Sequence, residues 1–155
     1  MVARAEPDGY TLLSTPAPPL AINHLLDPNM KVDPAAFVPI SLMTMVPNVL
    51  VINSKLPFKT LDEFIAYART NPGKLTYAST GPGGTPTLAM ELLKLKAGLQ
   101  IRDIPYGTGT GPAAIAVIGG QVDAMFVNIA EGLSHITSGG VRALGVGTLL
   151  SLIHI

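Results

Sequence analysis

Cysteine is absent from the 155 residues of this chain, and charged residues make up only 13% of them. Without cysteine, these residues form neither disulfide bonds nor thiolate metal sites. The ten basic and ten acidic side chains balance, which argues against a nucleic-acid-binding surface, because such a surface needs clustered lysine and arginine. No apolar run reaches the roughly 18 residues that would indicate a membrane-spanning helix.

Sequence motifs of common enzyme classes are missing as well. A hydrolase or transferase needs a nucleophile with its base, or a pair of carboxylates, but the chain has no G-x-S-x-G turn and no H-E-x-x-H helix. Its three histidines, His24, His135 and His154, are not spaced as metal ligands. We therefore expect no enzyme activity, no cofactor and no metal. Apolar residues make up 48% of the chain, enough for a core in one ordinary domain or in pieces of two small ones.

The most informative segment is residues 74–94, KLTYASTGPGGTPTLAMELLK. A short apolar run ends at Ser79 and Thr80, a glycine-rich stretch follows, and a helical pattern begins at Thr85. This order predicts a strand, a tight turn and a helix, with Thr85 as the N-cap and Pro86 at the first helical position. Backbone N–H groups at the start of such a helix have no intrahelical partner and favour an anion. The segment therefore predicts a site for a small anion.

A carboxylate suits this segment better than a phosphate or a dinucleotide. A Walker-type phosphate loop requires a lysine at the helix entry, and here the entry reads Gly84-Thr85-Pro86-Thr87. The dinucleotide fingerprint G-x-G-x-x-G fails at its third glycine, where Pro86 stands. Neutral donors without a fixed cation fit a carboxylate. An ordinary turn between strand and helix that binds nothing remains the alternative.

Strands and helices are expected to alternate along the chain. Apolar patterns and turn signals predict strands in 10–13, 75–78, 101–104, 121–127 and 141–146, and two short strands within 37–52. Helices are expected over 18–26, 61–70, 86–97, 112–119 and 129–138. Thr60 and Glu63 form a capping box. Leu88, Leu92 and Leu95 predict the buried stripe of the helix after the glycine-rich loop.

This alternation predicts an α/β fold with right-handed β–α–β units and a mainly parallel sheet flanked by helices. In such sheets the ligand lies beyond the carboxyl ends of the strands. The loops 79–87 and 106–111 and the position of Asn128 share polar or glycine-rich character at that end, and residues 14–16 are a fourth candidate.

Seven sequence blocks together resemble one protein family. They are PDGYTLL at 7–13, VPNVLVIN at 46–53, TLDEFIAYART at 60–70, NPGKLTYASTG at 71–81, PY at 105–106, GGQVDAMF at 119–126 and VRALGV at 141–146. In order and spacing they look like the solute receptors of tripartite tricarboxylate transporters, of the TctC or Bug type. The resemblance covers residue 3 to about residue 148. It implies the two-lobed fold of type II periplasmic binding proteins, here truncated at both ends.

The same resemblance implies a domain division and a function. Residues 1–48 would be part of lobe one, 49–142 would form lobe two, and 143–155 would return toward lobe one and end in an atypical tail. The function implied is an extracytoplasmic, periplasmic receptor that binds a di- or tricarboxylate or a related organic acid. The receptor would deliver this ligand to the membrane permease subunits of the transporter, as a monomer when intact and without nucleic acid. No signal peptide is visible in the opening residues MVARAEPDGY.

Ten residues are candidates for ligand contact on these grounds. They are Ser79, Thr80, Gly81, Gly83, Gly84, Thr85, Thr87, Tyr106, Asn128 and Thr15. Each has a structural alternative, because hydroxyl groups also satisfy strand ends, threonine and asparagine also cap helices, and a tyrosine ring also lines a core. Val127 stands where the family often has an aspartate, so we expect an amino acid ligand to be disfavoured.

A second class of function shares this architecture. The ligand-sensing lobe of a transcription regulator can have the same two-lobed fold, but it requires an attached helix-turn-helix. No basic recognition helix appears in the chain.

Overall fold

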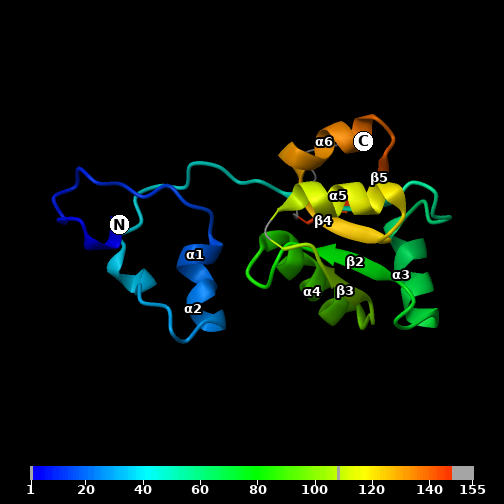
Figure 1. The fold of residues 1–155 in the computed structure, drawn as a ribbon, viewed down its shortest axis with the longest axis horizontal. Coiled ribbons are helices and arrows are strands. Elements are labelled where there is room, and N and C mark those ends of the chain that lie inside the picture. The colour runs from blue at the N-terminus through cyan, green and yellow to red at the C-terminus, as the bar shows by residue number, and fades with distance from the viewer. Residues whose placement is uncertain (1, 108, 148–155) are drawn as a thin grey trace. The chain divides into compact units, whose positions relative to one another are not determined.

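A computed structural model describes residues 2–107 and 109–147. The described residues fall into two compact units, one up to Thr44 and one from Met45 onward. The second unit contains the sheet and the long helices (Figure 1). None of the helices in the described part of the chain combines the length and the apolar character that crossing a membrane requires.

A five-stranded sheet forms the centre of the second unit. Its strands are β1 (Asn48–Asn53), β2 (Thr76–Ser79), β3 (Arg102–Pro105), β4 (Ala124–Asn128) and β5 (Val141–Val146), in the spatial order β3-β2-β4-β1-β5. Strand β2 pairs in parallel with β3 and β4, whereas β1 pairs antiparallel with both β4 and β5. Four strands therefore run in one direction and β1 runs against them. The predicted α/β fold with a mainly parallel sheet is confirmed.

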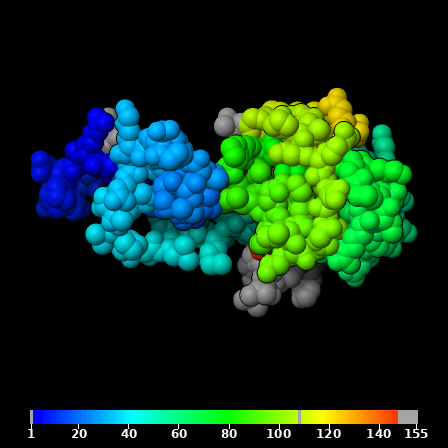
Figure 2. Space-filling model, turned by 90° about the horizontal axis from the view of Figure 1, so that it is seen from below, coloured from blue at the N-terminus to red at the C-terminus, as the bar shows by residue number. Residues whose placement is uncertain are grey.

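Helices cover both faces of the sheet. They are α3 (Leu61–Thr70), α4 (Thr85–Ala97), α5 (Thr110–Gly119) and α6 (Ile129–Thr137). Figure 1 shows α5 and α6 on one side of the sheet and α4 on the other. Two apolar clusters fill the layers, one with Tyr77 and Phe126 under α3 and α4, and one with Val49 and Val127 under α5 and α6. We call them the α3/α4 core and the α5/α6 core; Figure 2 shows the outer surface on the α3/α4 side.

Several helix boundaries follow directly from local sequence. The hydroxyl of Thr60 accepts the Glu63 N–H at 3.2 Å, and the Glu63 carboxylate accepts the Thr60 N–H at 3.3 Å, which confirms the predicted capping box. Helix α4 ends at Gly98, whose φ of 65° is a left-handed conformation that glycine adopts without strain. Helix α5 begins at Thr110, two residues earlier than expected.

Two predictions about α4 are wrong. Its N-cap is Gly84 and not Thr85, which is already helical and makes no capping bond. Leu92 and Leu95 are 55% and 79% exposed, whereas Met90 is fully buried. The sequence contains two apolar stripes at helical spacing, and the sheet packs against the one that carries Met90.

The first unit contains only short helices. They are η1 (Val2–Arg4), α1 (Pro18–Ala21), α2 (Asn23–Leu26) and η2 (Pro34–Ala36), so the helix expected over 18–26 is interrupted at Ile22. The strand expected at 10–13 does not form, and Tyr10 is 92% exposed. Only one of the two strands expected within 37–52 forms, as β1. A strand needs a hydrogen-bonded neighbour, and no described segment pairs with residues 10–13 or 37–47.

The predicted division into lobes stays a prediction. The two units meet at residues 44 and 45, and β5 pairs with β1 from Val141 to Val146. The expected boundary at residue 142 therefore falls inside a strand of the second unit. The atypical tail, 149–155, lies outside the described residues.

Candidate functional site

The carboxyl ends of the parallel strands meet at one end of the second unit. Ser79 ends β2, and its carbonyl accepts the N–H of Tyr106, the first residue after β3, at 3.0 Å. Asn128 ends β4 and lies opposite Asn48, the first residue of β1. The predicted loops 79–87 and 106–111 and Asn128 are thus brought together, except for Thr108, which lies outside the described residues.

The 79–87 loop is held in place by its own threonine. The buried hydroxyl of Thr87 accepts the N–H of Thr80 at 3.1 Å, which ties the end of β2 to the first turn of α4. Gly81 has a φ of 105°, a conformation that side chains disfavour. A Cβ at Gly84 would lie 2.7 Å from the hydroxyl of Thr80. The loop therefore needs glycine at 81 for its backbone and at 84 for space.

Four backbone N–H groups of this loop make no hydrogen bond to any described residue. They belong to Gly81, Gly83, Thr85 and Thr87. The N–H groups of Thr80 and Gly84 are occupied, the latter by the carbonyl of Gly81 at 3.2 Å. Free amides at the start of a long helix, with the positive end of the helix dipole, form a binding site for an anion.

Polar side chains continue this site across the sheet. Tyr77, Phe126 and Leu50 lie in the α3/α4 core, and side chains alternate along a strand. Ser79, Asn128 and Asn48, each two residues away, therefore lie on that same face, at the ends of three neighbouring strands. Ser79 is buried, with 2% of the residue exposed.

Asn48 was not predicted as a site residue. Its Oδ1 atom is shielded from solvent and accepts no hydrogen bond within the described part of the chain. A polar residue directly before the apolar run 49–52 was the available signal. The signal could not be used because it is the antiparallel direction of β1 that brings Asn48 beside Asn128.

Glu131 was also missed. Its carboxylate accepts a hydrogen bond from the hydroxyl of Thr110 and another, at 3.5 Å, from Nδ2 of Asn128. It thereby joins the first turns of α5 and α6, where the helix dipoles favour a negative charge. Asn128 occupies the predicted N-cap position of α6, but its side chain makes no capping bond to the backbone.

Three other residues considered in the sequence analysis do not lie on the face of the sheet that carries Ser79. The ring of Tyr106 packs against the α5/α6 core, on the opposite face from Ser79. Thr15 belongs to the first unit, and its hydroxyl donates to the carbonyl of Pro16 at 3.2 Å. Val127 is buried in the α5/α6 core, so it does not share a face with Asn128. The argument from Val127 against an amino acid ligand therefore loses its structural basis.

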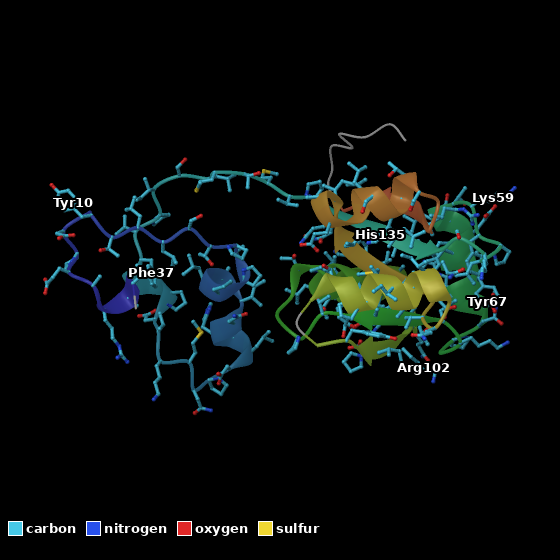
Figure 3. The ribbon with its side chains drawn as sticks, turned by 45° about the horizontal axis from the view of Figure 1, so that its top comes forward. Tyr10, Phe37, Lys59, Tyr67, Arg102 and His135 are labelled. Atoms are coloured by element: carbon cyan, nitrogen blue, oxygen red, sulfur yellow. The ribbon has the colours of Figure 1, made fainter. Side chains whose placement is uncertain are left out.

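Among the described strands, no lysine or arginine lies at this end of the sheet. Arg102 and Arg142 begin β3 and β5, at the opposite end. In Figure 3 the side chains of Lys59 and Arg102 lie away from the end of the sheet at which β1 begins. Among the described residues, no group of three acidic or histidine side chains gathers in a way that could hold a metal ion. The positive character of the site comes from backbone amides.

Helix α4 is anchored to β2 by a polar contact beyond the site. The hydroxyl of Tyr77 donates to Oε1 of Glu91 at 2.6 Å, and Lys94 donates to the same atom at 2.7 Å. Burial and the hydrogen bond to Glu91 raise the pKa of Tyr77 above its usual range. Burial alone would raise the pKa of Glu91, but the hydrogen bonds from Lys94 and Tyr77 outweigh it and lower that pKa. The contact holds α4 against β2.

Comparison with known proteins identifies the family. The sequence profile of the tripartite tricarboxylate transporter family receptor, TctC, matches residues 1–149. Protein BugT of Bordetella pertussis is 40% identical over 146 residues, which are 93% of this chain and 44% of BugT. The chain thus spans less than half the length of this curated relative.

Solved structures show the same fold. One described as a periplasmic transporter is 35% identical with a TM-score of 0.81, and the match covers 94% of this chain and 49% of that one. MatC from Rhodopseudomonas palustris, solved with bound malate, is 28% identical with a TM-score of 0.70, over 86% of this chain and 43% of MatC. An R. palustris protein solved with adipate is 32% identical with a TM-score of 0.65, over 67% of this chain and 34% of that protein.

The family profile and the match to BugT cover nearly the whole chain, including the strands and loops that form the site. The chain therefore belongs to the TctC family of tripartite tricarboxylate transporter receptors, which are solute-binding proteins with the α/β fold of periplasmic binding proteins.

Proposed function

We propose that this chain is the ligand-binding part of a periplasmic receptor that captures a small organic acid and delivers it to a tripartite tricarboxylate transporter permease. The observation that carries the proposal is the set of four free N–H groups, of Gly81, Gly83, Thr85 and Thr87, at the junction of β2 and α4. Family membership and the malate- and adipate-bound relatives support a carboxylate as the anion.

The carboxylate would bind at the amides, and hydroxyl groups would complete its coordination. Hydrogen bonds to a charged group contribute about 1.5–3 kcal/mol each, and a helix start adds about 0.3–1 kcal/mol. Three or four such bonds are enough for a micromolar complex, which needs about 8 kcal/mol after the costs of association. Ser79, Thr80 and Thr85 would supply hydroxyl groups, whereas Gly84 would shape the loop and Thr87 would position it.

The remaining candidate residues have smaller roles in this proposal, or none. Asn128 would contact the part of the ligand that extends across the sheet. Tyr106 would help to position the loop through its N–H bond to Ser79. Thr15 belongs to the first unit and has no assigned role in the proposal. The receptor would capture and release its ligand without catalysis, because the site combines amides and hydroxyl groups without an activated nucleophile.

Ligand-dependent stabilisation tests this function. The protein would be expressed from its natural reading frame and heated in the presence of malate, succinate, adipate or citrate, because a ligand that binds the native state raises Tm. We expect at least one acid to raise Tm, and its neutral amide to have no effect. If no organic acid shifts Tm at millimolar concentration in a folded sample, the proposal is wrong.

Variants of the loop test the location of the site. Gly81→Ala forces a side chain onto a φ of 105° and should weaken binding of the acid by about tenfold or more, because the amides lose their alignment. Gly73→Ala is the matched control, since Gly73 also has a positive φ of 72° but lies at the other end of β2. Equal loss of binding in both variants would argue against the 79–87 loop as the site.

A further inference from the structure

Helix α5 begins two residues before the place that its own sequence favours. Proline is common at the first position of a helix, where no N–H is needed, and this preference predicts a start at Pro112. In the structure Pro112 is at the third position, after Thr110 and Gly111. The residue before a proline is also disfavoured in a helical conformation, so helical Gly111 departs from a second local preference. A contact from outside the helix therefore has to stabilise these two residues.

No side chain of α5 itself caps this start. The N-cap residue is Gly109, which has a φ of 150° and no side chain. The first turn contains no acidic residue that could interact with the positive end of the helix dipole. The hydroxyl of Thr110 instead donates to Oε2 of Glu131, which lies in the first turn of α6. Glu131 thus supplies α5 with both a hydrogen-bond acceptor and a negative charge.

Glu131 makes this contact in place of a local one. It stands three residues after Asn128, the N-cap of α6, as Glu63 stands three residues after Thr60. This spacing allows a capping box, and the box forms at Thr60 and Glu63. At α6 the Asn128 side chain makes no capping bond, and the Glu131 carboxylate accepts from Nδ2 of Asn128 and from the hydroxyl of Thr110. The spacing that closes α3 on itself here joins two helices.

The start of α5 lies at the end of the sheet that carries the candidate site. Tyr106, the first residue after β3, donates its N–H to the carbonyl of Ser79 at 3.0 Å. A helix that started at Pro112 would release Thr110 and Gly111 and lengthen the connection that leaves Tyr106. A longer connection has more conformational freedom, which ligand binding must then remove. The position at which α5 starts therefore affects how ordered this end of the sheet is before a ligand binds.

We propose that Glu131 is a positioning residue of the receptor: its bond to Thr110 draws residues 110 and 111 into α5 and keeps the connection between β3 and α5 short. Glu131 acts through Thr110 and needs no contact with the ligand. The effect on binding rests on the proposed function. The effect on the start of α5 does not, so the two effects can be tested separately.

Hydrogen exchange, followed by NMR on the receptor expressed from its natural reading frame, measures where α5 begins. In an α-helix each N–H donates to the carbonyl four residues before it. A start at Thr110 therefore occupies the N–H groups of Ala113 and Ala114, whereas a start at Pro112 leaves both free. Thr110→Val keeps the volume and removes the donor, so exchange at both alanines should become about tenfold faster, with Ile115 unchanged. Thr110→Ser keeps a hydroxyl and should retain slow exchange.

Non-additivity identifies Glu131 as the partner of Thr110. Glu131→Ala should speed exchange at Ala114 as much as Thr110→Val does, and the double variant should add nothing, because both changes remove the same bond. Glu131→Gln removes the charge but keeps an acceptor, so exchange should be slower than in Glu131→Ala. Glu63→Gln is the matched control, since Glu63 holds the same position in α3. It should leave exchange at Ala114 unchanged.

Binding is compared between wild type and Thr110→Val, because this change leaves the charge near the site unaltered. Calorimetry would use whichever of malate, succinate, adipate and citrate raises Tm most. The variant should bind this acid about three- to tenfold more weakly, since the connection must be ordered on binding. Thr110→Ser should bind within about twofold of wild type.

Each outcome decides one claim. Unchanged exchange at Ala114 in Thr110→Val and Glu131→Ala, or additive effects in the double variant, would overturn the role of the bond. Faster exchange with unchanged affinity would overturn the positioning role and leave the proposed function intact. Failure of every acid to bind would overturn the proposed function, and exchange would still decide where α5 starts. If Thr110→Val impairs folding, Glu131→Ala, at an exposed position, decides the exchange experiment.

Discussion

The hydroxyl of Tyr77 donates a hydrogen bond of 2.6 Å to the Glu91 carboxylate and so joins β2 to α4. Lys94 donates to the same carboxylate oxygen at 2.7 Å and lies 5.2 Å from the centre of the Tyr77 ring. The junction between β2 and α4 is where the candidate site lies. The contact therefore links the stability of the second unit to the position of the free amides, and it predicts how stability responds to pH.

At high pH, Tyr77 should make the protein less stable. Its folded-state pKa is raised above the usual value of about 10, so its contribution is complete below that pH and is lost as the pH rises further. Urea unfolding at pH 9 and pH 11 should show this loss, and Tyr77→Phe should show a smaller one. Tyr10→Phe is the control, because Tyr10 is 92% exposed. An identical alkaline loss in wild type and Tyr77→Phe would contradict the prediction.

At low pH, protonation of the Glu91 carboxylate should make the protein less stable. Its pKa is lowered in the folded state, so its contribution is present above the unfolded-state value of about 4.3 and is lost as the pH falls through the folded value. Glu91→Gln should reduce the slope of stability against pH in the acid range. The effect should be small, because about half of the Glu91 side chain is exposed. A steeper acid slope in the variant would show that the sign is wrong.

Gly132 should not tolerate a larger side chain. A Cβ at this position in α6 would lie 2.6 Å from Cγ1 of Val127 in β4, so Gly132→Ala should destabilise the protein by about 1–3 kcal/mol. Adding Val127→Ala should relieve the overlap and recover part of the loss, measured by urea unfolding. Gly119→Ala in α5 is the control, because a Cβ there would meet nothing within 4 Å; it should be neutral or stabilising.

Arg142 should not be replaceable by lysine. Its guanidinium donates to the carbonyl groups of Ser54, Leu56 and Phe58 at 2.7–2.9 Å and holds the segment after β1 against β5. A lysine reaches fewer of these carbonyls, so Arg142→Lys should cost about 1–3 kcal/mol of unfolding free energy. Arg102→Lys, at an exposed position, should cost less than about 0.5 kcal/mol. Similar losses in both variants would rule out a special role for the three hydrogen bonds that the Arg142 guanidinium donates.

Thr87 should hold the candidate loop in shape. Thr87→Val keeps the volume but removes the acceptor for the Thr80 N–H, so we expect a loss of about 1 kcal/mol and faster hydrogen exchange at the Thr80 amide. Thr70→Val is the control, since the Thr70 hydroxyl donates to carbonyls of its own exposed helix turn and accepts from the side chain of the adjacent Asn71, and no backbone N–H depends on it. Unchanged exchange at Thr80 would mean that the bond does not constrain the loop.

Features that depend on a few neighbouring residues could be predicted from the sequence. The capping box of Thr60 and Glu63, the glycine end of α4 and the strand–loop–helix order around Ser79 form as expected. The gathering of the loops at one end of the sheet was also predictable, because parallel strands place their carboxyl ends together. These features are why the segment 74–94 indicated a strand–loop–helix junction as the place for a candidate site.

Features that depend on pairing between distant segments could not be predicted. The buried stripe of α4 is the one with Met90 because the sheet packs there, although Leu92 and Leu95 have the same spacing. The segment at 10–13 has a strand pattern but lacks a neighbour among the described residues. Tyr106 was a candidate for ligand contact and Val127 was expected to influence the choice of ligand, but both side chains pack in the α5/α6 core.

The amino-acid sequence by itself determined the α/β class and the glycine-rich loop, since these follow from local patterns of apolar, capping and turn residues, and the resemblance of its sequence blocks indicated the family. Only the tertiary structure decided that β1 runs antiparallel between β4 and β5, which brings Asn48 beside Asn128. It also decided that Glu131 contacts Thr110 across 21 residues. Strand direction and register are set by contacts between distant segments, and a single sequence does not contain them in readable form.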